Sequence, residues 1–137
     1  MGYKKILLAD DDADDKMIIA DAVKLLSDEE VMYFTENGEE TLNALNKDYE
    51  RGELPCLIVL DLNMPRMNGT ETLGQIKSDV RFKDIPVIIY STSINPLEKE
   101  KCLLLGAHSY VTKAISFKES MDTAKHFFEF CSNVAVE

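Results

Sequence analysis

The sequence CLIVLD, residues 56–61, places five apolar residues in succession directly before an aspartate. A short apolar run without polar alternation predicts a strand that is covered on both faces of a sheet. Four further runs have a similar content of β-branched, aromatic and other apolar residues, and they span residues 5–9, 31–35, 86–90 and 109–112. The chain therefore predicts five short strands.

Stretches with apolar residues at helical spacing lie between and after these runs. The expected core-facing residues are Ile18, Ala22 and Leu25; Leu42, Leu45 and Tyr49; Leu73, Ile76 and Val80; Leu97, Leu104 and Leu105; and Phe117, Met121, Ala124 and Phe128. Five alternations of strand and helix predict an α/β fold, a doubly wound parallel sheet with helices on both faces. Right-handed crossovers then place the carboxyl ends of all strands at one edge. We expect residues 1–137 to form a single domain.

The composition narrows the classes of partner. The 137 residues are 45% hydrophobic and 29% charged, with a formal net charge of −10. This acidic balance argues against nucleic acid or an anionic membrane as a direct partner, because both attract basic patches. No apolar run approaches the roughly 20 residues of a membrane-spanning helix, and the N-terminus does not resemble a signal peptide. We expect a soluble protein of the cytoplasm.

The three cysteines, Cys56, Cys102 and Cys131, each lie in an apolar context. Their number is odd and no two of them have the C-x-x-C spacing of metal or redox motifs. Free cysteine behaves as a small hydrophobic residue, and cytoplasmic thiols stay reduced. We therefore expect three buried, reduced thiols.

Polar side chains follow four of the five apolar runs. In chain order they are Asp10 and Asp11, Asp61, Ser91 with Thr92, and Lys113. Because ligands of such sheets bind beyond the carboxyl ends of the strands, we expect these side chains to converge. Carboxylates in close proximity repel one another unless a hard cation lies between them, and oxygen ligands suit Mg2+ or Mn2+. With a hydroxyl and an ammonium nearby, the set is typical of a phosphoryl-transfer site.

The source of the phosphoryl group must lie outside the chain, since neither G-x-x-x-x-G-K nor G-x-G-x-x-G occurs. Asp61 is then a plausible nucleophilic acceptor. Asp12 and Asp14 are expected to cap the first helix. Asp10, Asp12 and Asp14 also match alternate positions of a calcium loop, but Asp15 stands where that loop needs glycine.

Four segments together resemble the receiver domain of two-component response regulators. They are ILLADDD (6–12), LIVLDLNMPRMNG (57–69), PVIIYSTS (86–93) and GAHSYVTKA (106–114), and they occur in the family's order. The stretch SDVRFKDIPVIIYSTS is similar to the small stand-alone receivers that partner phytochrome-type histidine kinases. The resemblance implies a flavodoxin-like sheet with strand order 2-1-3-4-5 and five helices.

The resemblance also implies roles for the acidic residues. Asp61 matches the phosphoacceptor of the family, and Asp10 and Asp11 match its acidic metal pair. Asn63 matches the residue whose backbone carbonyl completes the metal shell. The implied metal site is thus Asp10, Asp11, Asp61 and the carbonyl of Asn63, holding Mg2+ or Mn2+.

Three further positions match the family's catalytic and switch residues. Ser91 matches the hydroxyl that moves toward the phosphoryl group, Lys113 the lysine that pairs with it, and Tyr110 the aromatic that then changes rotamer. Two positions depart from the family. Ala114 replaces a proline that is usually joined by a cis bond, which before a non-proline residue costs about 3 kcal/mol, so the loop is expected to differ. Asn68 replaces an acid at a position where asparagine can start a helix.

As a receiver, the chain is expected to act as a single-domain response regulator in a phosphorelay. It would accept the phosphoryl group from a sensor histidine kinase or phosphotransfer protein, without turning over an external substrate. The signal would leave to an unknown downstream protein through the face of the fourth helix, fifth strand and fifth helix, which also offers a homodimer contact. A small aspartate-nucleophile phosphatase is the alternative, but Asn63 replaces the second acid that such enzymes use. A receiver scaffold that is never phosphorylated is the third possibility.

Overall fold

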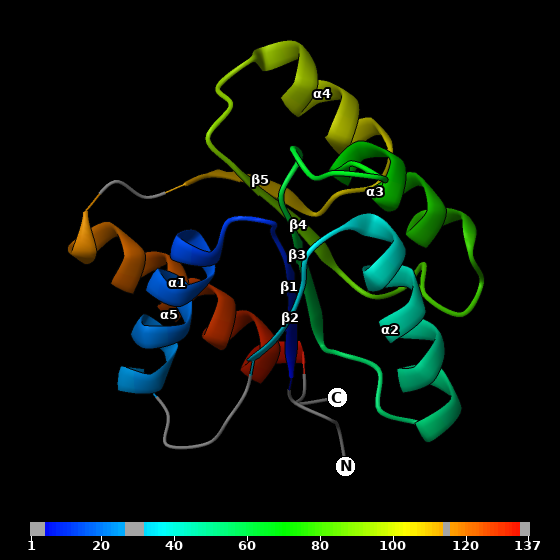
Figure 1. Ribbon diagram of the computed structural model, residues 1–137, viewed down its shortest axis with the longest axis horizontal. Helices are drawn as coiled ribbons and strands as arrows, with labels where there is room; N and C mark the ends of the chain where they lie inside the picture. The colour runs from blue at the N-terminus through cyan, green and yellow to red at the C-terminus, as the bar shows by residue number, and fades with distance from the viewer. Residues whose placement is uncertain (1–4, 27–31, 114–115, 135–137) are drawn as a thin grey trace.

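Strands and helices alternate along the whole described chain, which in this computed structural model comprises residues 5–26, 32–113 and 116–134. The elements are β1 (Ile6–Ala9), α1 (Ala13–Leu26), β2 (Met32–Thr35), α2 (Gly38–Arg51), β3 (Leu57–Leu60), α3 (Gly69–Ser78), β4 (Val87–Ser91), α4 (Pro96–Leu104), β5 (Ser109–Thr112) and α5 (Phe117–Val134) (Figure 1). Each strand begins within one residue of the apolar run that predicted it.

The five strands form one parallel sheet in the order β2-β1-β3-β4-β5. This order confirms the predicted doubly wound, flavodoxin-like topology. β1 lies between β2 and β3, so that Leu8 pairs with Phe34 on one side and with Val59 on the other. Because all strands run in the same direction, their carboxyl ends meet at one edge of the sheet.

The helices form two layers around the sheet. α1 and α5 lie against one face, and α2, α3 and α4 lie against the other (Figure 1). Successive residues of β1 point into opposite layers, as the pleat of a strand requires. Leu7 joins the core beneath α2 and α3, whereas Leu8 joins the core beneath α1 and α5. All four residues of β1 and of β3 are buried, which explains their continuous apolar sequence.

The predicted core face of the first helix is confirmed at Ala22, which is buried, but it is wrong at Ile18 and Leu25. These two are 47% and 68% exposed, whereas Ile19 and Val23 are buried. Because α1 contains several apolar residues in succession, two of its faces have apolar residues at helical spacing. Only one of these faces packs against the sheet. In α5 a shift by one residue makes Phe127, rather than Phe128, the buried ring.

Five more of the residues expected in the core are exposed. They are Tyr49, Val80, Leu97, Leu104 and Leu105. Val80 lies beyond the end of α3 at Ser78, so the helix stops before the third apolar position of its stripe. In α4, Cys102 rather than a leucine provides the buried contact.

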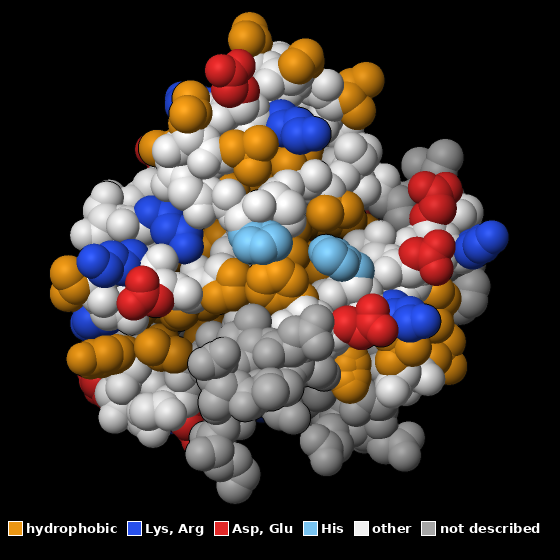
Figure 2. Space-filling model, turned by 180° about the vertical axis from the view of Figure 1, so that it is seen from behind, with side chains coloured by type: hydrophobic (Ala, Val, Ile, Leu, Met, Phe, Trp, Pro, Cys, Tyr) orange, Lys and Arg blue, Asp and Glu red, His pale blue; other side chains and the backbone are white. Residues whose placement is uncertain are grey.

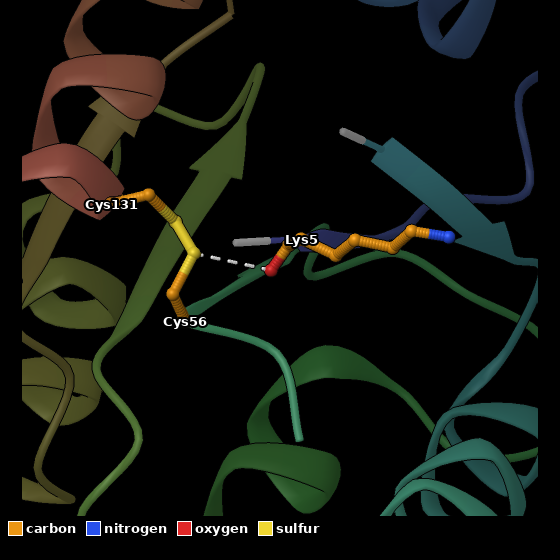
Figure 3. Close-up of a disulfide and its surroundings, with 3 residues drawn as sticks. All are labelled: Lys5, Cys56 and Cys131. Atoms are coloured by element: carbon orange, nitrogen blue, oxygen red, sulfur yellow. Dashed lines mark hydrogen bonds between the residues drawn. A yellow bond between two sulfur atoms is a disulfide. The ribbon is translucent and has the colours of Figure 1, made fainter. Parts of the chain in front are cut away.

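The prediction of three reduced thiols is wrong for this structure. Cys56 and Cys131 form a disulfide with their Cα atoms 5.5 Å apart, and Cys102 is free and buried. The bond joins the segment before β3 to α5 (Figure 3). The two cysteines are 75 residues apart in the chain, so only the folded topology brings them together. The Cys56 sulfur also lies 3.2 Å from the carbonyl oxygen of Lys5 (Figure 3).

Candidate functional site

The backbone places two aspartates at the carboxyl edge of the sheet. The Asp10 N–H donates to the Thr35 carbonyl at 3.0 Å, and the Asp61 N–H donates to the Ala9 carbonyl at 2.9 Å. The parallel hydrogen-bond pattern therefore continues one residue beyond β1 and β3. Both residues are buried, at 1% and 5% exposure.

Three carboxylates meet at this edge, as the sequence predicted. One oxygen each from Asp10, Asp11 and Asp61 lies within 4.8 Å of the other two, and Asp11 is the exposed member. We call these three residues the acidic triple. Asn63 lies exposed two residues after Asp61, and its N–H donates to Asp61 Oδ1 at 3.4 Å. Three oxygens at this separation, one of them open to solvent, fit a hard divalent cation that keeps some of its water.

The ammonium of Lys113 lies at this site, as the sequence predicted. Its Nζ donates to Asp10 Oδ2 and to Asp15 Oδ2, each at 2.7 Å, and to Asp61 Oδ2 at 3.3 Å. The lysine side chain is only 7% exposed. Its backbone is held beside β4, because the Lys113 N–H donates to the Ser91 carbonyl at 2.8 Å.

Burial and neighbouring charge shift the pKa of two of these groups. Burial raises the pKa of Asp61 to about 6, with Lys113 opposing the rise and Asp10 adding to it. Burial alone would lower the pKa of Lys113, but its hydrogen bonds to Asp10 and Asp15 and the charges of Asp10 and Asp61 hold that pKa above its usual range. Lys113 therefore stays charged, while metal-free Asp61 takes up a proton more easily than an exposed aspartate does.

The predicted switch residues are linked through one loop residue. The Ser91 side chain is fully buried, and its Oγ accepts the N–H of Ser93 at 3.2 Å. The Tyr110 hydroxyl donates to the carbonyl of the same Ser93 at 2.8 Å. The ring of Tyr110 is half-buried against the core beneath α2, α3 and α4, whereas Thr92 is exposed. The Ser93 backbone therefore connects Ser91 to Tyr110 by two hydrogen bonds.

The loop after Asp61 is packed closely against α3. The Gly69 N–H donates to the Leu62 carbonyl at 3.0 Å. A Cβ atom at Gly69 would lie 2.8 Å from the Leu62 Cα and would also overlap the backbone of Asp61. Asn68 caps α3, forming a reciprocal pair with Glu71, which confirms its expected place at a helix start.

Asp15 is the residue at this site that the sequence analysis missed. It is the third residue of α1, and an acidic residue in the first turn of a helix is common because it interacts favourably with the helix dipole. Its position in the sequence therefore does not indicate a role in the site. Asp12 does accept the N–H groups of Asp14 and Asp15, as its predicted capping role requires. Asp14 lies within the helix, and among the described residues its side chain accepts no capping hydrogen bond. Ala114, where the family usually has proline, lies outside the described residues.

Comparison with known proteins identifies the family. Residues 6–125 match the family described as "Response regulator receiver domain". The chain belongs to this family. The receiver is 30% identical over 118 residues to Response regulator Rcp1 of Synechocystis sp., which covers 85% of this chain and 80% of Rcp1. It is 31% identical over 109 residues to Chemotaxis protein CheY1 of Helicobacter pylori, covering 80% of this chain and 84% of CheY1.

Solved structures agree with the sequence relatives. The phosphorylated cyanobacterial phytochrome response regulator RcpA superimposes with a TM-score of 0.84 at 32% identity, covering 96% of this receiver and 95% of RcpA. The Mn2+-bound form of Rcp1 superimposes with a TM-score of 0.81 at 29% identity, covering 93% of each chain. The predicted resemblance to stand-alone receivers of the phytochrome type is thus confirmed. Neither the phosphatase nor the scaffold alternative is favoured by these relatives.

Proposed function

We propose that this receiver accepts a phosphoryl group on Asp61 from a sensor histidine kinase or phosphotransfer protein. The observation that carries the proposal is the convergence of the acidic triple with the Lys113 ammonium at the carboxyl edge of the sheet. Mg2+ is the cation we propose, held by Asp10, Asp11, Asp61 and the backbone carbonyl of Asn63. The existence of a Mn2+-bound form of the relative Rcp1 supports a divalent site.

The chemistry follows from the charges at the edge. An Asp61 oxygen attacks phosphorus, and the bond from phosphorus to the donor's nitrogen or oxygen breaks with the electron pair leaving on the donor. A bound divalent cation would offset the negative charge that gathers on the phosphoryl oxygens. Lys113 lies close enough to Asp61 to donate to one of those oxygens, and its pKa keeps it charged. Burial of Asp61 limits the access of water to the acyl phosphate.

The signal then passes through Ser91 and Tyr110. Three acceptor oxygens on Asp61 draw the Ser91 hydroxyl, which gives up its contact with the Ser93 N–H. Tyr110 donates to the carbonyl of Ser93, so the change at Ser93 is passed on to Tyr110. The phosphoryl group thus biases a two-state element toward one of its arrangements.

The surface that we propose for output is formed by α4, β5 and α5. Ile94, Leu97 and Leu104 are 83%, 74% and 81% exposed on or beside α4. Figure 2 shows hydrophobic side chains scattered over the protruding part of the molecule at the top, where α4 lies in Figure 1. Downstream proteins or a second copy of the chain are the proposed occupants. Sedimentation with and without the phosphoryl mimic beryllofluoride distinguishes them, because only self-association changes the mass of the isolated protein.

We infer that the receiver works in the cytoplasm, where kinases have access to ATP. No described helix has the length and apolar character needed to cross a membrane. Disulfides are rare in a reducing compartment, so there we expect Cys56 and Cys131 as thiols. The reduced Cys56 thiol would donate to the carbonyl of Lys5, 3.2 Å away.

Phosphorylation by a small donor tests the proposal directly. With Mg2+ and acetyl phosphate, the intact mass should increase by one phosphoryl group in the parent and in Asp12→Asn, but not in Asp61→Asn. Asp12→Asn is the matched control, because it removes one nearby charge while asparagine can still cap α1. Labelling of Asp61→Asn at the parental rate would reject Asp61 as the acceptor.

A further inference from the structure

The resting ammonium of Lys113 lies closer to Asp10 and Asp15 than to the proposed acceptor Asp61. Its two 2.7 Å contacts are to Asp10 and Asp15, whereas Asp61 lies 3.3 Å away. Asp15 differs from the other two carboxylates because it is not a member of the acidic triple. It is also the most exposed of the three, with 32% of its side chain accessible against 1% for Asp10.

A cation in the acidic triple would change the balance among these contacts. The cation would partly neutralise the carboxylates of Asp10 and Asp61, and this would weaken their electrostatic attraction to the Lys113 ammonium. The cation would not neutralise the carboxylate of Asp15, because this carboxylate lies outside the acidic triple. Asp15 would therefore still attract the Lys113 ammonium. The ammonium then has two competing partners, Asp15 on α1 and the oxygens of a phosphoryl group on Asp61.

We propose that Asp15 is a positioning residue that holds Lys113 in a resting place and competes with the phosphoryl group for its ammonium. This inference rests on the proposed phosphorylation of Asp61. Among the described residues, the Asp15 carboxylate accepts a hydrogen bond from Lys113 and from no member of the acidic triple, so it acts through Lys113. Its loss should therefore favour the state in which Lys113 donates to the phosphoryl oxygens.

The first turn of α1 supplies a matched control. Asp14 precedes Asp15 in the same turn and is exposed, and Lys113 donates to Asp15 but not to Asp14 among the described residues. Asp14→Asn removes the same charge from the same helix end. Any effect on the helix dipole or on the general field of the site should thus be similar in Asp14→Asn and Asp15→Asn.

The test compares Asp15→Asn, Asp14→Asn and Asp15→Glu in the full chain. Beryllofluoride affinity is measured by 19F NMR or calorimetry at saturating Mg2+, and urea unfolding monitors the fold. Asp15→Asn should bind beryllofluoride about two- to five-fold more tightly than the parent, as expected for the loss of one partly exposed ion pair. Asp14→Asn should change the affinity less than about two-fold by comparison, since it breaks no such pair. Asp15→Glu should return the affinity toward the parental value.

A second measurement follows the lysine itself without Mg2+ or beryllofluoride. Acylation by an amine-reactive reagent, followed by peptide mass spectrometry, reports how readily Lys113 leaves its carboxylates. Asp15→Asn should be labelled at Lys113 several-fold faster than the parent and Asp14→Asn.

Two results would overturn the inference. The first is equal behaviour of Asp15→Asn and Asp14→Asn in both measurements, and the second is weaker beryllofluoride binding by Asp15→Asn. If the parent itself neither binds beryllofluoride nor accepts phosphate, the proposed function fails and the positioning role fails with it. If the parent is phosphorylated normally but Asp15→Asn and Asp14→Asn behave alike in both measurements, only the role of Asp15 is rejected and the proposed function stands.

Discussion

Reduction of the disulfide between Cys56 and Cys131 should lower the free energy of unfolding by about 4 kcal/mol. Cross-linking two residues 75 positions apart removes chain entropy from the unfolded state that corresponds to about 4.5 kcal/mol at 25 °C. The reduced Cys56 thiol can donate to the carbonyl of Lys5, which returns about 0.5 kcal/mol. Cys102 is free and buried in either state, so its contribution should cancel.

Urea unfolding of protein purified without reductant, followed by circular dichroism, measures this difference. With a slope of about 2 kcal/mol per molar urea, the midpoint should fall by roughly 2 M when a phosphine reductant is added. Cys56→Ser is the control, because it cannot form the bond and its hydroxyl can donate to the same carbonyl. This variant should unfold near the midpoint of the reduced parent, whether or not reductant is present.

Two outcomes would refute the reasoning. If alkylation and mass spectrometry show that reductant opens the bond but the midpoint stays the same, loop closure does not stabilise this fold. If all three cysteines react with a thiol reagent in the unfolded, unreduced protein, the pairing itself is wrong. A midpoint of Cys56→Ser that moves with reductant would show that the reductant acts elsewhere.

Three further predictions concern the site and the loop that carries it. Gly69→Ala should destabilise the fold by more than about 1 kcal/mol in urea, whereas Gly74→Ala, with no atom near the new Cβ, should stabilise it by about 0.5–1 kcal/mol. Because the pKa of Asp61 in the folded state is about 6, the metal-free protein should lose up to about 3 kcal/mol of unfolding free energy as the pH rises from 4 to 7. Urea unfolding at a series of pH values measures this loss, and Asp61→Asn should remove most of it. Calorimetry should show that Asp11→Ala weakens Mg2+ binding more than Asp12→Ala; equal losses would indicate only a diffuse acidic surface.

The sheet could be predicted because burial on both faces leaves an unbroken apolar run. The run at 56–60 became β3, Leu57–Leu60, with every residue buried. Helix faces were harder, because α1 contains consecutive apolar residues whose exposure depends on a one-residue rotation. Ile18 and Ile19 are equally apolar in sequence, yet only Ile19 meets the sheet.

The acidic triple could be predicted because Asp10 and Asp61 directly follow strands and Asp11 is the next residue after Asp10. Asp10 and Asp61 continue the hydrogen-bond pattern of β1 and β3, so their convergence follows from the topology alone. The contact of Asp15 with Lys113 could not be predicted in this way, since it depends on how α1 leaves the sheet. The pairing of Cys56 with Cys131 likewise depends on where α5 crosses the opposite end of β3.

Three carboxylates contact one ammonium at this edge, and the carboxylate of Asp11 lies beside two of them, so repulsion among these negative charges disfavours the metal-free folded state. Burial raises the pKa of Asp61 to about 6, with the Asp10 charge adding to the rise, so protonation of Asp61 removes part of this negative charge more easily than it would from an exposed aspartate. The proposed divalent cation would relieve more of it, and its binding to the folded state alone would add stability that grows with the logarithm of its concentration. The proposed phosphoryl group would then restore negative charge at Asp61, and Lys113 is the cation already in reach. On this proposal the charge at the edge differs among the metal-free, metal-bound and phosphorylated states, so that phosphorylation would shift Ser91 and Tyr110 between two arrangements.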